Sequence, residues 1–115
     1  MKEKIGDKAR LQHILDAIQE IENYTDKADL SVFQSNSMML YASVKQLEII
    51  GEAAKNLSED FKNLCKEIPW SEISGLRNIL VHEYFGVDKK IIWQIIQDDI
   101  PFFKKKLSEI NRFIL

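Results

Sequence analysis

Apolar residues recur at intervals of three or four positions along most of the chain, and this helical spacing constrains the fold more than any other feature. One stripe consists of Leu11, Ile14, Leu15, Ile18 and Ile21. It predicts a helix over residues 8–26, with Asp7 as a candidate N-cap. Only 4 Gly and 2 Pro occur in 115 residues, which is too few for the turns of a many-stranded β-fold. An all-α chain is therefore expected.

A second long helix is expected over residues 37–57, with Asn36 or Ser37 as its N-cap. Its main apolar stripe consists of Leu40, Val44, Leu47, Gly51 and Ala54. A further apolar set flanks that stripe and consists of Ala42, Ile49, Ile50, Ala53 and Leu57. This second set exceeds what one amphipathic helix of a monomer needs, and we interpret the surplus as a face that packs against a partner chain.

The rest of the chain carries further start and stop signals for helices. Ser58, with acidic residues close behind it, predicts a short helix. Pro69 suits the first turn of a helix over residues 70–84, because its ring is poorly tolerated deeper in a helix. Asp88 can cap a last helix, which Pro101 should bend or divide.

Length and charge narrow the class of protein. The chain of 115 residues has the size of one domain, residues 1–115, and we expect an up-and-down bundle of four to five helices that dimerises through helix faces. The 16 basic and 18 acidic residues, with a sequence pI near 5.7, exclude a broadly positive surface for nucleic acid. Any contact with phosphate must therefore be local.

The cellular setting follows from what the sequence lacks. Cys65 is the single cysteine, so it cannot form an internal disulfide, and it suits core packing in a reducing compartment. No stretch approaches the roughly 18 apolar residues of a membrane span, and the amino terminus has no apolar run. We expect a soluble, cytoplasmic protein with no membrane segment.

The stretch RNILVHEY, which begins at Arg77, places polar side chains where a helix should bury isoleucine and leucine. At about 100° per residue, Arg77 and Tyr84 lie on the side of the helix marked by Leu80. His82 lies about 140° from Arg77 and close to Asn78. Two geometries would bring Arg77 and His82 together: the helix frays near His82, or two copies of the helix meet at a two-fold axis.

Histidine and arginine together suit cleavage of an RNA phosphodiester. His82 would remove the proton of a 2′-hydroxyl, while Arg77 would stabilise the charge that gathers on the phosphate oxygens, with no metal ion or other cofactor. Asn78 would orient the histidine or the phosphate. From spacing alone, an arginine and a histidine on one helix more often form a salt bridge, make a helix-end interaction or are solvated than act in catalysis.

The stretch GLRNILVHEYFGVD, Gly75 to Asp88, resembles the signature of the HepT-like branch of the HEPN superfamily. That pattern is Arg, a polar residue, three more positions, His, any residue and Tyr, and Arg77, Asn78, His82 and Tyr84 match it position by position. LEIIGEAAKNLS, which begins at Leu47, also resembles the second helix of this family. The PW dipeptide at residues 69–70 resembles the start of its catalytic helix.

The resemblance implies a helical homodimer with Arg77 and His82 in a cleft between the two copies, acting as a metal-independent endoribonuclease on RNA. It further implies a toxin of a type VII toxin-antitoxin pair, held in check by a nucleotidyltransferase antitoxin of the MNT type. That antitoxin would attach AMP to Tyr84, and anionic groups beside Arg77 and His82 would repel RNA.

A competing hypothesis is a non-catalytic helical module that binds a nucleotidyltransferase partner or a nucleotide, which the acidic pI favours. One other feature, a run of three lysines, has both a functional and a structural interpretation. The run Lys104 to Lys106 suits either RNA steering or a solvated face. His13 lies about 200° from Leu11 around its helix and is expected on the surface.

Overall fold

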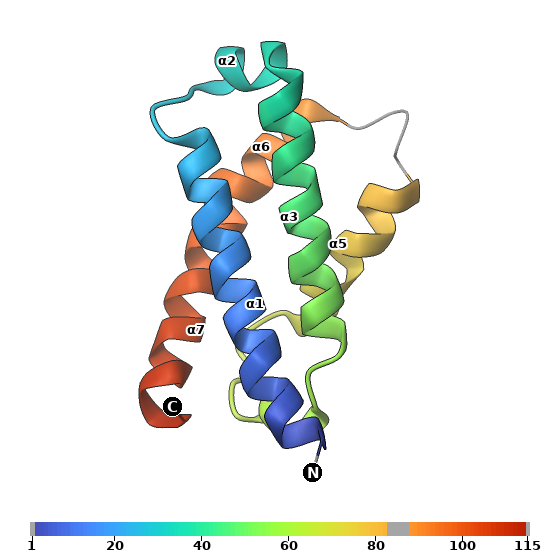
Figure 1. Ribbon diagram of the computed structural model, residues 1–115, viewed down its shortest axis with the longest axis vertical. Coiled ribbons are helices and arrows are strands. Elements are labelled where there is room, and N and C mark those ends of the chain that lie inside the picture. The colour runs from blue at the N-terminus through green and yellow to red at the C-terminus, as the bar shows by residue number, and fades with distance from the viewer. Residues whose placement is uncertain (1, 83–87, 115) are drawn as a thin grey trace.

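The computed structural model describes residues 2–82 and 88–114, with side chains for residues 6–76 and 88–110. Its principal helices alternate in direction (Figure 1): α1 (Lys2–Thr25), α3 (Ser37–Lys55), α5 (Trp70–His82) and a last segment made of α6 (Lys89–Gln94), the π-helix η1 (Ile95–Asp99) and α7 (Ile100–Ile114). Two short helices, α2 (Leu30–Ser35) and α4 (Glu59–Asn63), connect them. No strand occurs among the described residues. The predicted all-α, up-and-down bundle is confirmed.

Helix starts follow the capping residues that the sequence indicates. The Asn36 side chain accepts a hydrogen bond from the Met39 amide at 3.0 Å and opens α3. Ser58 Oγ accepts one from the Phe61 amide at 3.1 Å and opens α4. Asp88 accepts one from the Lys90 amide at 3.0 Å and opens α6. These predictions are confirmed, because an N-cap is a contact within a few residues of chain.

The expected start of the first helix is wrong. α1 begins at Lys2, so Asp7 lies inside the helix and does not cap it. Its carboxylate instead accepts hydrogen bonds from the amide and the hydroxyl of Ser58, at 2.8 and 2.5 Å. Asp7 thereby fastens α1 to the start of α4.

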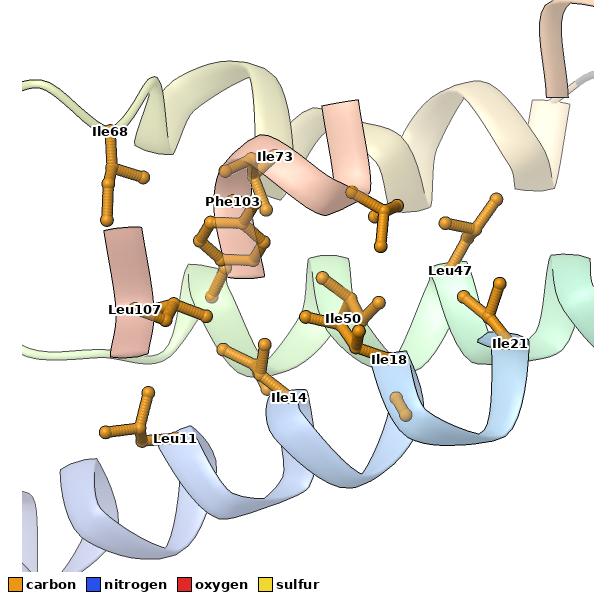
Figure 2. Close-up of a cluster of buried hydrophobic side chains, with 14 of the residues drawn as sticks. Leu11, Ile14, Ile18, Ile21, Leu47, Ile50, Ile68, Ile73, Phe103 and Leu107 are labelled. Carbon is orange, nitrogen blue, oxygen red and sulfur yellow. The ribbon is translucent and has the colours of Figure 1, made fainter. Parts of the chain in front are cut away.

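The core lies where α1, α3 and α7 face one another, and Figure 2 shows their side chains pointing toward a shared interior. α3 makes the most extensive contacts, with α1 and with α5. Leu47 of the main stripe is fully buried. Of the second set, Ile50 and Ala53 on α3 and Leu57 just after it are buried, whereas Ala42 and Ile49 are half-buried. The second set is thus largely covered within one chain, and it is no longer an argument for a partner. Cys65 is buried, as expected.

Pro101 disturbs the last helical segment, as the sequence predicts. The proline has no amide hydrogen, so the carbonyl of Gln97 loses its usual helical donor. The turn immediately before it is a π-helix, in which the Ile100 amide donates to the Ile95 carbonyl. One extra residue is thus accommodated between α6 and α7. None of the described helices combines the length and apolar character that a bilayer crossing requires.

Candidate active site

Helix α5 carries the candidate residues of the polar motif. It remains an α-helix up to and including His82, so fraying before that residue is not observed. The backbone positions of Arg77 and His82 therefore stay about 140° apart around the helix and about 7.5 Å apart along it. The side chains of Arg77, Asn78 and His82 are outside the described set, and Tyr84 lies outside the described residues.

The start of α5 is fixed by Trp70. Its indole N–H donates hydrogen bonds to the carbonyls of Cys65 at 3.0 Å and Lys62 at 3.2 Å. Its ring meets Phe61 and Phe103 edge-on, with centroids 6.1 and 5.8 Å apart. Trp70 thus ties the first turn of the motif helix to α4, to the following loop and to α7.

The next turns of α5 form one wall of a cavity of about 300 Å³, which we call the α5–α7 pocket. Its apolar lining consists of Pro69, Ile73, Leu76, Ile95, Ile100, Phe102 and Phe103. Ile73, Ile100 and Phe103 are buried, whereas Phe102 is 47% exposed. The pocket combines an apolar floor with an exposed aromatic edge.

Acidic side chains stand at the edge of the α5–α7 pocket. Glu72 from α5 and Asp99 from η1 both line it, and both are exposed. Partial desolvation of the Asp99 carboxyl group, together with the charges of Asp98 and Glu72, raises its pKa above the usual value. The sequence analysis missed this site, because its two acidic residues are contributed by segments far apart in the chain.

A second hollow, the α1–α3 groove, has a volume of about 520 Å³ and also contains an arginine and a histidine. Arg10 and His13 line it from α1 and Lys45 from α3, but Glu48 and Glu52 line it as well. His13 is exposed, as expected. The groove therefore brings an arginine and a histidine together within one copy, although charges of both signs surround them.

The lysine run is largely engaged with acidic residues. Lys104 Nζ lies 2.9 Å from a Glu22 carboxylate oxygen on α1. Lys106 Nζ lies 2.9 Å from Glu67 and 5.7 Å from the centre of the Phe102 ring. These contacts favour the structural interpretation of the run over an RNA-steering patch.

Among the described side chains, no group of three or more His, Cys, Asp and Glu residues could hold a metal ion.

Comparison with known proteins connects this chain to a family of ribonucleases. A family model described as "Ribonuclease HepT-like" matches residues 14–110, which include the motif on α5 but neither Arg10 nor His13. The chain is 39% identical to the "Probable ribonuclease HepT" of Thermococcus cleftensis, over 95% of this chain and 99% of the relative. It is 41% identical to a "Putative RNase" of Methanocaldococcus jannaschii, over 88% of this chain and 93% of the relative. No solved structure matches the chain significantly. The sequence match therefore shows that this chain belongs to the family of HepT-like ribonucleases.

Proposed function

We propose that this chain is a metal-independent endoribonuclease and the toxin of a type VII toxin-antitoxin pair. The observation that carries the proposal is the position of Arg77, Asn78 and His82 on one continuous helix, inside the segment that matches the ribonuclease family. The ribonuclease names of the relatives support the same activity here.

The proposed reaction uses the ribose 2′-hydroxyl as the nucleophile. His82 removes its proton, the 2′ oxygen forms a bond to the adjacent phosphorus, and the bond from phosphorus to the 5′ oxygen breaks. The proton passes from His82 to the departing 5′ oxygen. Arg77 stabilises the negative charge on the non-bridging phosphate oxygens, and Asn78 orients the histidine or the phosphate. The products are a 2′,3′-cyclic phosphate and a 5′-hydroxyl.

The helical geometry supports a homodimer as the active form. Residues about 140° apart on one helix do not easily reach the same phosphate, whereas two α5 helices that meet near a two-fold axis can present Arg77 of one copy and His82 of the other. The active site is then completed by the second copy.

The proposed antitoxin is a nucleotidyltransferase of the MNT type that modifies Tyr84. The phenolic oxygen attacks the α-phosphorus of ATP, a phosphorus–oxygen bond forms, pyrophosphate leaves, and the phenolic proton passes to solvent. The added phosphate is anionic and lies two residues from His82, so it repels the RNA backbone. The support for this step is the match of Tyr84 to the family motif.

The decisive experiment measures cleavage of single-stranded RNA with EDTA present. The wild type should cut RNA to products with a 2′,3′-cyclic phosphate and should leave DNA of the same sequence intact, because DNA lacks the nucleophile. His82→Ala and Arg77→Ala should each lose activity by about a hundredfold or more. His13→Ala is the matched control, since it removes the other histidine, and it should retain activity. Equal cleavage by the wild type and both α5 variants would reject the proposal.

The modification is tested by intact mass after incubation with ATP and a nucleotidyltransferase of the MNT type, taken from the neighbouring gene if that gene encodes one. The wild type should gain the mass of adenylate groups, and Tyr84→Phe should gain none. Tyr41→Phe is the control, because Tyr41 is 54% exposed and lies outside the motif. Added mass that persists in Tyr84→Phe would place the modification elsewhere.

The competing function is a non-catalytic module that binds a nucleotidyltransferase or a nucleotide. The sequence pI near 5.7 favours it, since an RNA enzyme usually gains affinity from excess positive charge. The cleavage assay separates the two functions, because a binding module cuts no RNA in either the wild-type or the variant form.

A further inference from the structure

We propose that the α5–α7 pocket is a docking site for a partner protein, whose contacting segment carries an apolar side chain next to a lysine or arginine. This proposal does not depend on the ribonuclease activity. It rests on the apolar floor of the pocket, on its size and on carboxylates at its edge that have no ion pair among the described side chains.

The apolar part of the pocket is open to a ligand. Ile73, Ile100 and Phe103 form a buried floor, and Phe102 is 47% exposed. A volume of about 300 Å³ lies at the lower limit of small-molecule sites. The pocket therefore suits one or two inserted side chains better than a whole nucleotide.

The negative charge at the edge of the pocket favours a partner with a basic side chain. Glu72 and Asp99 line the pocket, and Asp98 lies near enough to Asp99 to influence its ionisation. None of these three carboxylates has an ion pair with a described lysine or arginine. Lys106, whose Nζ lies 5.7 Å from the centre of the Phe102 ring, is already bonded to Glu67 at 2.9 Å. A basic side chain from a partner would supply the missing positive charge.

The same charges argue against other occupants. RNA would bring phosphates toward Glu72 and Asp99 and would be repelled. A second copy that docked by a two-fold axis through this surface would place the two sets of carboxylates face to face, which is also unfavourable. A protein segment with one apolar and one basic side chain is complementary to both the apolar floor and the acidic edge of the pocket.

The pocket lies beside the candidate active site, because the same helix contributes to both. Glu72, Ile73 and Leu76 belong to α5, and Leu76 directly precedes Arg77 in that helix. The adjoining wall contains Ile95 and Asp99 of the π-helix, a type of turn that is often found at functional sites. A bound partner would thus contact the helix that carries the catalytic candidates.

The test uses the full ¹⁵N-labelled chain and three peptide probes observed by NMR. Acetyl-Trp-Arg-Leu-amide has the proposed chemistry, acetyl-Trp-Glu-Leu-amide reverses the charge, and acetyl-Gly-Arg-Gly-amide lacks the apolar groups. The first peptide should cause saturable shifts at the amides of Leu76, Ile95 and Phe102, and the other two should cause none. Equal shifts with either of those two, or shifts confined to other residues, would overturn the proposal.

Charge-matched variants extend the test. The double variant Glu72→Gln with Asp99→Asn should bind the first peptide about fivefold more weakly. Glu20→Gln with Asp26→Asn is the control, because it removes the same charge at exposed positions of α1 and the turn that follows. Equal weakening in both double variants would overturn the proposal. So would shifts of the Ile95 and Phe102 amides, which lie away from Arg77 in the sequence, on adding oligouridine or on raising the protein concentration alone, since the occupant would then be RNA or a second copy.

Discussion

The carboxylate of Asp7 accepts hydrogen bonds from both the amide and the hydroxyl of Ser58, a residue 51 positions further along the chain. Ser58 in turn accepts from the Phe61 amide and opens α4. One carboxylate thus links the amino-terminal half of α1 to the N-cap residue of α4.

We predict that Asp7→Ala lowers the free energy of unfolding by about 2 kcal/mol, because two charge-assisted hydrogen bonds are lost. Chemical denaturation of the full chain measures the change. Asp16→Ala is the control, since Asp16 lies on the same helix and its carboxylate bonds only an exposed neighbour, Gln12. That variant should change the free energy by about 0.5 kcal/mol or less. A similar loss in both variants would show that the link to Ser58 adds no stability.

Trp70→Phe should destabilise the chain by about 2–3 kcal/mol, because it removes the donor to the carbonyls of Cys65 and Lys62 and leaves space beside Phe103. Trp93→Phe is the matched control. Trp93 packs on Phe33 at 5.1 Å but donates no indole hydrogen bond to any described residue. Denaturant midpoints should fall clearly further for Trp70→Phe, and a larger fall for Trp93→Phe would contradict the anchoring role.

The sequence predicted those features that depend on a few neighbouring residues. Asn36, Ser58 and Asp88 each cap a helix as expected, since the contact spans two or three positions. Asp7 was assigned wrongly, because a capping residue type does not reveal that the residues before it are also helical. Its real partner lies in another element, and no local pattern specifies such a contact.

For the candidate site too, local features could be predicted from the sequence, whereas contacts between distant segments could not. The motif fixes the register of Arg77 and His82 on α5, but whether the two groups meet depends on how copies assemble. The surplus apolar face on α3 lost most of its value as an indication of a partner chain for a related reason, because α5 and α1 cover most of it from within the chain. The α5–α7 pocket was not predictable either, since Glu72 and Asp99 come together only in the folded bundle.

Ser43→Ala should stabilise the chain. The Ser43 hydroxyl on α3 is fully buried and has no hydrogen-bond partner among the described residues, so it carries an uncompensated cost of burial. We expect a gain of about 1 kcal/mol beyond the effect of helix propensity. Ser108→Ala measures that propensity effect alone, because Ser108 is exposed in the interior of α7. A Ser43→Ala variant less stable than the wild type would mean that the hydroxyl is bonded.

Asp99→Asn should change the pH dependence of stability. The pKa of Asp99 is raised in the folded chain by burial, Asp98 and Glu72, so the folded state binds its proton more tightly than the unfolded state does. Its contribution to stability is therefore present below the ordinary pKa of 3.8 and is lost as the pH rises through the raised value. At neutral pH the variant should be slightly more stable than the wild type. As the pH rises from 3.8 through the raised pKa of Asp99, the stability of the variant should fall less than that of the wild type. Parallel stability curves for the two proteins would contradict this assignment.

Mixing inactive variants would show whether the active site is shared between copies. If Arg77 of one copy works with His82 of the other, a dimer of Arg77→Ala with His82→Ala contains one intact site and one doubly altered site. Random exchange at equal amounts makes half of the dimers mixed, so cleavage should recover to about one quarter of the wild-type rate. Each variant alone should stay inactive. If both residues acted within one copy, every site in the mixed dimer would lack one of them, and unfolding and refolding the two variants together would restore no cleavage.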